Sequence, residues 1–137
     1  MDTYKEIYQC WHDHGVEMIV HHSDSYAATL VPYMIEMGID IWQGALPNND
    51  IPSLIKQYGD KITIMGDIDS SKIDVEGWTR ELVRDEVRRA MDECGPYSFI
   101  PCTTQGAPLS NFEGVLDCAI EEVAACSKEC FGNWKRS

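Results

Sequence analysis

The side chains best suited to chemistry stand where two apolar runs of the sequence end. His22 and Asp24, in the segment HHSDS, follow the run 16–21, and Cys102 closes the run 97–102. Imidazole, carboxylate and thiolate groups all bind zinc, and a site with three protein ligands leaves a fourth position for a substrate. A thiol bound there loses its proton and becomes a nucleophile. These residues predict a zinc site, with a purely structural role for His22 as the alternative.

The two adjacent histidines must point in opposite directions if the run 16–21 is a strand. Side chains alternate between the faces of a sheet, so Met18 and Val20 share the face of His22. Ile19 shares the opposite face with His21. Only one of the two histidines can therefore belong to the predicted zinc site.

Other polar residues follow the remaining apolar runs. Asp67 and Asp69, in the segment MGDIDSS, can act as general acids or bases, or can cap backbone amides. Gln43 and Gln105 add hydrogen-bonding groups after two further runs. We expect Gln43, Asp69 and Gln105 to bind substrate.

The elements that must position these residues alternate along the chain. Short apolar runs at 16–21, 39–44, 61–66 and 97–102 predict strands, and the segments between them, with a helix before 15 and another at 110–131, have a helical period. This order, α(βα)4, predicts an α/β fold with four parallel strands in a single domain over residues 1–137. In such folds the loops that leave the carboxyl ends of the strands carry the chemistry.

Helix boundaries are indicated by glycines and by capping residues. Glycines at 15, 38, 59 and 95 stand where helices should end. Ser25, Asn49 and Ser110 are expected to cap the amino termini of helices 25–38, 50–59 and 110–131. Arg80, Arg84 and Arg88 recur every four residues, interleaved with acidic residues of the same helix. That spacing predicts a solvated face with ion pairs inside the helix.

Composition narrows the class of partner and the compartment. Eleven basic and 23 acidic residues give a net charge of −12, which disfavours nucleic acid and anionic membranes. The six cysteines contain no CxxC pair, and Cys118, Cys126 and Cys130 are expected in a helix core. The start MDTYKEIYQC lacks the pattern of a signal peptide, and no apolar run approaches the roughly 18 residues that span a bilayer. We expect a cytoplasmic chain.

Four segments together resemble the carboxyl-terminal half of the uroporphyrinogen decarboxylase superfamily. They are MIVHHSDS, IDIWQGA, ITIMGDIDS and YSFIPCTTQGAPLSNFEGVLDCAIEEV, and the likeness extends over essentially the whole chain. The superfamily includes zinc-dependent corrinoid methyltransferases. The resemblance implies the carboxyl-terminal half of a TIM-type (β/α)8 barrel, with methyl transfer from a corrinoid protein to a zinc-activated thiol.

The resemblance also assigns residues. The methyltransferase branch has a His-x-Cys after the first of these strands and a cysteine after the last, which match His22 and Cys102, with Asp24 in place of the first cysteine. The decarboxylases carry a histidine where this chain has Gln105, and their substrate-binding arginines belong to the other half. Decarboxylation of a porphyrinogen-like polyacid is therefore a weaker alternative, as is an inactive half-barrel that serves as an interaction module.

A half-barrel leaves both edges of its sheet open. The expected partner is a second copy in a homodimer, or a separate chain that supplies the amino-terminal half-barrel.

Overall fold

The fold is built on a parallel sheet of four strands in the order β1-β2-β3-β4. The computed structural model describes residues 2–104 and 110–131. The strands are β1 (Val20–His22), β2 (Ile41–Ala45), β3 (Thr63–Ile68) and β4 (Phe99–Thr103). The predicted α/β class and parallel strands are confirmed. Because the sheet order follows the chain order, β1 and β4 form its two edges.

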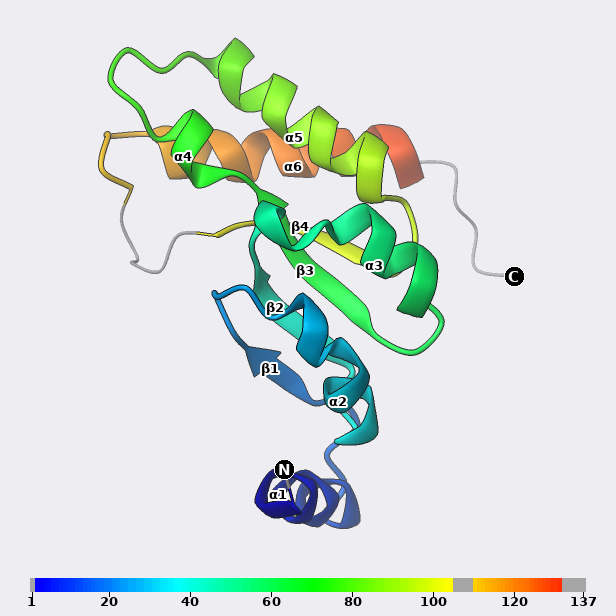
Figure 1. Cartoon of the computed structure of the whole chain (residues 1–137). Helices are drawn as coiled ribbons and strands as arrows, with labels where there is room; N and C mark the ends of the chain where they lie inside the picture. Colours follow the sequence, from blue (N-terminus) through cyan, green and yellow to red (C-terminus); the bar gives the residue numbers. More distant parts are fainter. Residues whose placement is uncertain (1, 105–109, 132–137) are drawn as a thin grey trace.

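Helices occupy the connections between the strands. They are α1 (Asp2–Asp13), α2 (Val31–Glu36), α3 (Ile51–Tyr58), α4 (Ser70–Ile73), α5 (Arg80–Cys94) and α6 (Val115–Phe131), with 3-10 turns at Ala28–Leu30 and Pro47–Asn49. Helices α5 and α6 pack side by side next to β4, and α1 lies beyond β1 at the other end of the sheet (Figure 1). Within residues 2–104 and 110–131, none of the helices combines the length and apolar character that crossing a membrane requires.

One face of the sheet is buried under helices and the other is largely open. Trp42 and Ile64, at neighbouring positions of β2 and β3, are completely buried. On the other face Val20 of β1 and Ile100 of β4 remain 52% and 37% exposed. Burying a large apolar side chain contributes about 1.5–3 kcal/mol, so the buried face holds the sheet together and the open face still exposes apolar area.

A glycine allows close approach of β2 and β3 at a register shift between Gln43 and Ala45. Gly66 has φ +154°, and a Cβ built on it would lie 2.3 Å from the carbonyl oxygen of Ala45. No other residue fits at that position without moving the backbone of β2.

The prediction that Asn49 is the N-cap residue of α3 was wrong. Asp50, with φ 53°, occupies the N-cap position of α3. Asn49 is instead buried, and its Oδ1 accepts hydrogen bonds from the amides of Ala27 (2.8 Å) and Ala28 (2.9 Å). Asn49 therefore supports the helical turn that precedes α2, across 21 or 22 residues of sequence.

Two other predicted helix starts were also wrong. The helical segment expected from Ser25 begins at Ala28, after the N-cap position Ala27. The helix expected from Ser110 begins at Val115, directly after Gly114, whose φ of +81° is not helical; the preceding segment is held by hydrogen bonds from the amides of Asn111 (2.8 Å) and Phe112 (3.0 Å) to Asp74.

All six cysteines are free thiols. Cys118 and Cys126 lie in the core, as predicted for small thiols on the inward face of α6. The prediction for Cys130 was wrong, because this residue lies on the exposed side near the end of the helix.

Candidate metal centre

The imidazole of His22 is held in a defined orientation at the end of β1. Its Nδ1 lies 2.6 Å from Oε1 of Gln43, the residue opposite His22 on β2. An amide oxygen only accepts hydrogen bonds, so this contact suits a neutral imidazole in its Nδ1–H tautomer, with Nε2 as the nitrogen open to a ligand. Histidines that bind metals are oriented in this way, with the distal nitrogen free for the ion.

Asp24 faces that free nitrogen. Its Oδ2 lies 3.9 Å from Nε2 of His22, and both side chains are more than half exposed. This separation is too long for a hydrogen bond. A tetrahedral zinc ion holds its nitrogen and oxygen ligands about 3.3 Å apart, so a small movement of the exposed carboxylate brings both groups onto one ion.

Gly44 makes room for the His22 ring. A Cβ on Gly44 would lie 3.0 Å from Cε1 and 3.1 Å from Nδ1 of His22, and the residue has φ +88°. Its lack of a side chain therefore lets the imidazole rest against the backbone of β2. Gly44 was not expected from the sequence to shape the site, although a glycine inside a predicted strand is a recognised sign of close approach.

Backbone contacts fix the loop between His22 and Asp24. Ser23 donates its amide to the carbonyl oxygen of Gln43 at 3.0 Å, and the indole of Trp42 donates to the carbonyl oxygen of Ser23 at 2.8 Å. The predicted alternation of the histidines is confirmed, because His21 turns to the helical side, where its Nδ1 lies 2.8 Å from the hydroxyl of Tyr8.

Cys102 lies on the opposite edge of the sheet. Its Sγ donates to the carbonyl oxygen of Thr103 at 3.3 Å, and burial raises the pKa of the Cys102 thiol. Two strands separate β4 from β1, which corresponds to about 14 Å of sheet between the edge strands. Over residues 2–104 and 110–131, no three histidine, cysteine, aspartate or glutamate side chains lie together as a metal site. The structure thus pairs His22 with Asp24 and leaves Cys102 apart.

Asp69 caps the helix that follows β3. Its Oδ1 accepts from the amide of Ser71 at 3.0 Å and from the Ser71 hydroxyl at 2.6 Å. This is the capping alternative left open by the sequence, and substrate binding by Asp69 stays a prediction. Gln105, the other residue expected to bind substrate, lies outside the described residues.

Asp67 points away from the strand-end loops. It is 1% exposed, and its Oδ2 lies 3.2 Å from both Nη1 of Arg89 and Sγ of Cys94. Burial raises the pKa of Asp67, against the opposing influence of Cys94 and Arg89. Glu86, also buried, accepts from the amide of Asp69 at 3.0 Å and from Arg89. This network fixes the loop after β3 and was not foreseen from the sequence.

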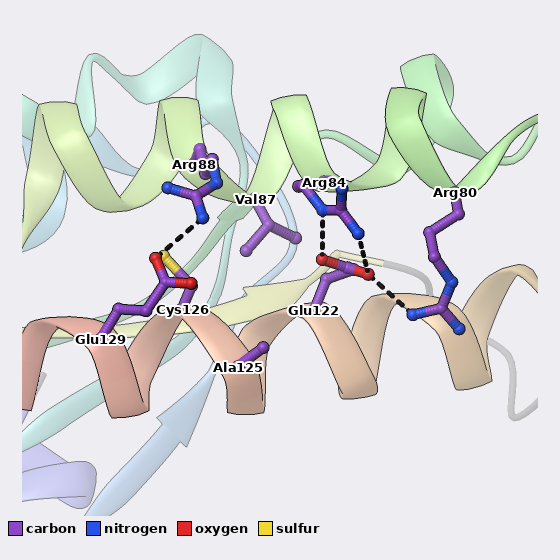
Figure 2. A pocket seen from close by; sticks show the side chains of 8 residues that line it. All are labelled: Arg80, Arg84, Val87, Arg88, Glu122, Ala125, Cys126 and Glu129. Carbon is purple, nitrogen blue, oxygen red and sulfur yellow. Dashed lines mark hydrogen bonds and ion pairs between the residues drawn. The ribbon is translucent and has the colours of Figure 1, made fainter. Parts of the chain in front are cut away.

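The arginines of α5 form a ladder with α6. Nε of Arg84 donates to Glu122 at 2.9 Å, Nη1 of Arg80 donates to Glu122 at 2.7 Å, and Arg88 donates to Glu129 at 2.8 Å (Figure 2). The predicted ion pairs inside α5 were therefore misassigned, because the partners belong to the neighbouring helix. The groove between these helices has a volume of about 420 Å³, but its arginine and glutamate side chains already form ion pairs with each other.

No protein-family model and no curated protein matches this chain. At the end of β1, the structure places Nε2 of His22 beside Oδ2 of Asp24 and holds the His22 ring through Gln43.

Proposed function

We propose that this chain is half of a TIM-type (β/α)8 barrel, related to the uroporphyrinogen decarboxylase superfamily, and that it transfers a methyl group from a corrinoid protein to a thiol at a zinc centre. The observation that carries the proposal is the orientation of His22. Gln43 holds Nδ1 at 2.6 Å, Gly44 leaves room for the ring, and Nε2 faces Asp24.

The half-barrel is supported by the arrangement of the sheet. Four parallel strands follow one another in chain order, with a helical connection after each of the first three and α6 after β4. In a complete barrel of eight strands, the inner face is filled by side chains. Here that face still exposes Met18, Val20 and Ile100 at 58%, 52% and 37%, as expected for a half that lacks its complement.

In this proposal each residue of the site has a separate role. His22, Asp24 and Cys102 would hold zinc, and Gln43 would position His22. Bound zinc supplies a positive charge that favours the thiolate form of an acceptor thiol. The acceptor thiol would lose its proton to solvent and its sulfur would take the methyl group from the corrinoid, so that a sulfur–carbon bond would form as the cobalt–carbon bond broke and the electron pair of that bond stayed with the corrinoid.

A second candidate function is that of a half-barrel that binds another chain without catalysis. The observation that favours it is the separation of Cys102 from His22, since the described residues hold no group of three metal ligands. Decarboxylation of a polyacid is not supported in the same way. Each arginine among the described residues lies on α5 and pairs with a carboxylate, which leaves none at the strand ends to bind an acidic substrate.

The test measures zinc and methyl transfer on the same protein. The chain is purified under reducing conditions without chelator, beside Cys102→Ala and the control Cys10→Ala, which removes an exposed thiol on α1. We expect close to one zinc per chain in the wild type and the control, and little in Cys102→Ala. Zinc-loaded protein should then demethylate free methylcobalamin in the presence of 2-mercaptoethanol, followed by the absorbance of the cobalamin. Bound zinc without demethylation would contradict the proposed reaction, and no zinc in the wild type would favour the binding module.

A further inference from the structure

We propose that a pocket between α1, α2 and β1 binds a small, planar aromatic molecule that carries a hydroxyl group. The pocket has a volume of about 400 Å³, and pockets that hold small molecules measure about 300–1,000 Å³. It is lined by His21, on the helical side of the sheet, and not by His22 or Asp24. The inference therefore does not rest on the proposed methyl transfer.

The position of α1 relative to α2 shapes this pocket. The two helices lie near each other at the β1 end of the sheet (Figure 1), and an ion pair between Lys5 of α1 and Glu36 of α2 joins them. Tyr8 anchors α1 to the sheet, because its side chain is buried and its hydroxyl lies 2.8 Å from Nδ1 of His21. Together these contacts hold the two walls of the pocket in place.

Aromatic and thioether side chains form most of the lining. Tyr4 of α1 and Tyr33 of α2 are both about half exposed, whereas Met34 is almost completely buried. Leu30 and Met37 complete the apolar part of the wall. Tyrosine rings and methionine sulfur both make favourable contacts with an aromatic ring. An aromatic ligand therefore fits this lining better than an aliphatic one of the same size.

His21 supplies a hydrogen-bonding group inside the pocket. The ring of Tyr4 meets the His21 ring edge-on, with centroids 6.0 Å apart and planes at 87°. Nδ1 of His21 is engaged by the Tyr8 hydroxyl, and within residues 2–104 and 110–131 Nε2 has no such partner. A neutral imidazole offers Nε2 as a donor or as an acceptor, according to its tautomer. A ligand hydroxyl, which both donates and accepts, pairs with either tautomer.

Two other grooves of the described structure lack this combination. The groove of about 420 Å³ between α5 and α6 is lined by arginines and glutamates that pair with each other. A groove of about 310 Å³ between β4 and α6 is apolar, and its Cys102 thiol, a weak donor, already donates to the backbone of Thr103. The net charge of −12 disfavours an anionic ligand. A neutral, phenol-like molecule is therefore the class that the pocket fits.

Binding of 2-naphthol to the full chain, followed by the fluorescence of the probe, tests this site. We expect one molecule per chain, with a Kd of about 0.1–1 mM for a ligand of this size, and weaker binding of naphthalene, which lacks the hydroxyl. His21→Phe keeps a ring and removes Nε2, so it should weaken 2-naphthol binding about 3- to 10-fold and leave naphthalene binding unchanged. Tyr33→Ala removes part of the wall and should weaken the binding of both probes.

A matched control places the probe on the molecule. Val20 lies on the open face of the sheet and is 52% exposed, and Val20→Thr should leave the binding of both probes unchanged. Weaker binding in Val20→Thr than in Tyr33→Ala would place the probe on the open sheet face and overturn the inference. Binding that no variant changes would show an adventitious additive only.

Two further results would also count against the site. Equal affinity of the wild type for 2-naphthol and naphthalene would remove the role of the hydroxyl, and a titration that does not saturate would remove the site itself. Circular dichroism establishes that the variants fold. Because Tyr33 is half exposed, Tyr33→Ala decides the question even if His21→Phe, which leaves the Tyr8 hydroxyl without its partner, fails to fold.

Discussion

The imidazole of His22 owes its orientation to two neighbours on β2, Gln43 and Gly44. Gln43 holds the ring through its contact with Nδ1, and Gly44 leaves the space that the ring fills. Residues that orient a metal ligand commonly change metal affinity 10- to 100-fold, about as much as some ligands do. The chemistry of this strand end is thus decided as much by the glutamine and the glycine as by the histidine.

Gly44→Ala should therefore damage the site beyond its effect on stability. The added methyl group meets the His22 ring at 3.0 Å, and the backbone at φ +88° is strained for alanine. We expect the free energy of unfolding to fall by about 1–3 kcal/mol and the zinc affinity, measured by competition with a chromophoric chelator, to fall at least 10-fold.

Gly77→Ala is the matched control for that substitution. Gly77 has φ +73°, but a Cβ there meets nothing within 4 Å. It should lose a similar amount of stability and keep its zinc affinity. Equal loss of affinity in both variants would show that backbone strain, and not the contact with His22, governs the site.

At the scale of elements, the sequence predicted the alternation of strands and helices because that alternation is local. Apolar runs and helical periods repeat within a few residues, so four strands and the helices between them were recognised. Helix starts were less predictable, since distant residues decide them. Helix α6 begins only at Val115, after Gly114 with φ +81°, and Asp74 holds Asn111 and Phe112 before it, a contact that no pattern near residue 110 records.

The ion pairs between α5 and α6 were equally hard to predict from the sequence, because they depend on which helices pack against each other. Glu122 is 6% exposed and accepts hydrogen bonds from Arg84 and Arg80. These bonds, from Arg84 foremost, lower the pKa of Glu122. A carboxyl group whose pKa is lower in the folded state stabilises the fold above the pKa of the unfolded chain and loses this contribution as pH falls through the folded pKa.

Glu122→Gln should accordingly lower the free energy of unfolding at pH 7 by about 1–2 kcal/mol. The expected loss is this small because solvent screens both arginines, which are half exposed. The difference from the wild type should shrink below about pH 4.3, the usual pKa of glutamate. Urea unfolding at pH 7 and pH 3 measures both values. Glu121→Gln, at an exposed carboxylate that pairs with Arg80, should change stability much less at pH 7. A difference for Glu122→Gln that is independent of pH would contradict the ionic interpretation.

At the scale of the whole molecule, the two faces of the sheet differ: helices cover one face, and the other is largely exposed. Helices bury Trp42 and Ile64 on one face, while the opposite face exposes Met18, Val20 and Ile100. Both edge strands are free of further pairing among the described residues. The residue types suggested His22, Asp24 and Cys102 as zinc ligands, but not that the described part of one chain would keep Cys102 apart from the other two, because strand order becomes visible only in the sheet.

Zinc X-ray absorption on the wild type, loaded with one equivalent of zinc per chain, tests the proposed centre most directly. We expect one sulfur ligand at about 2.3 Å together with nitrogen and oxygen ligands at about 2.0–2.2 Å. The sulfur signal should disappear in Cys102→Ser, and the imidazole signal should disappear in His22→Ala. Zinc bound by nitrogen and oxygen alone in the wild type, or a sulfur signal that persists in Cys102→Ser, would contradict it.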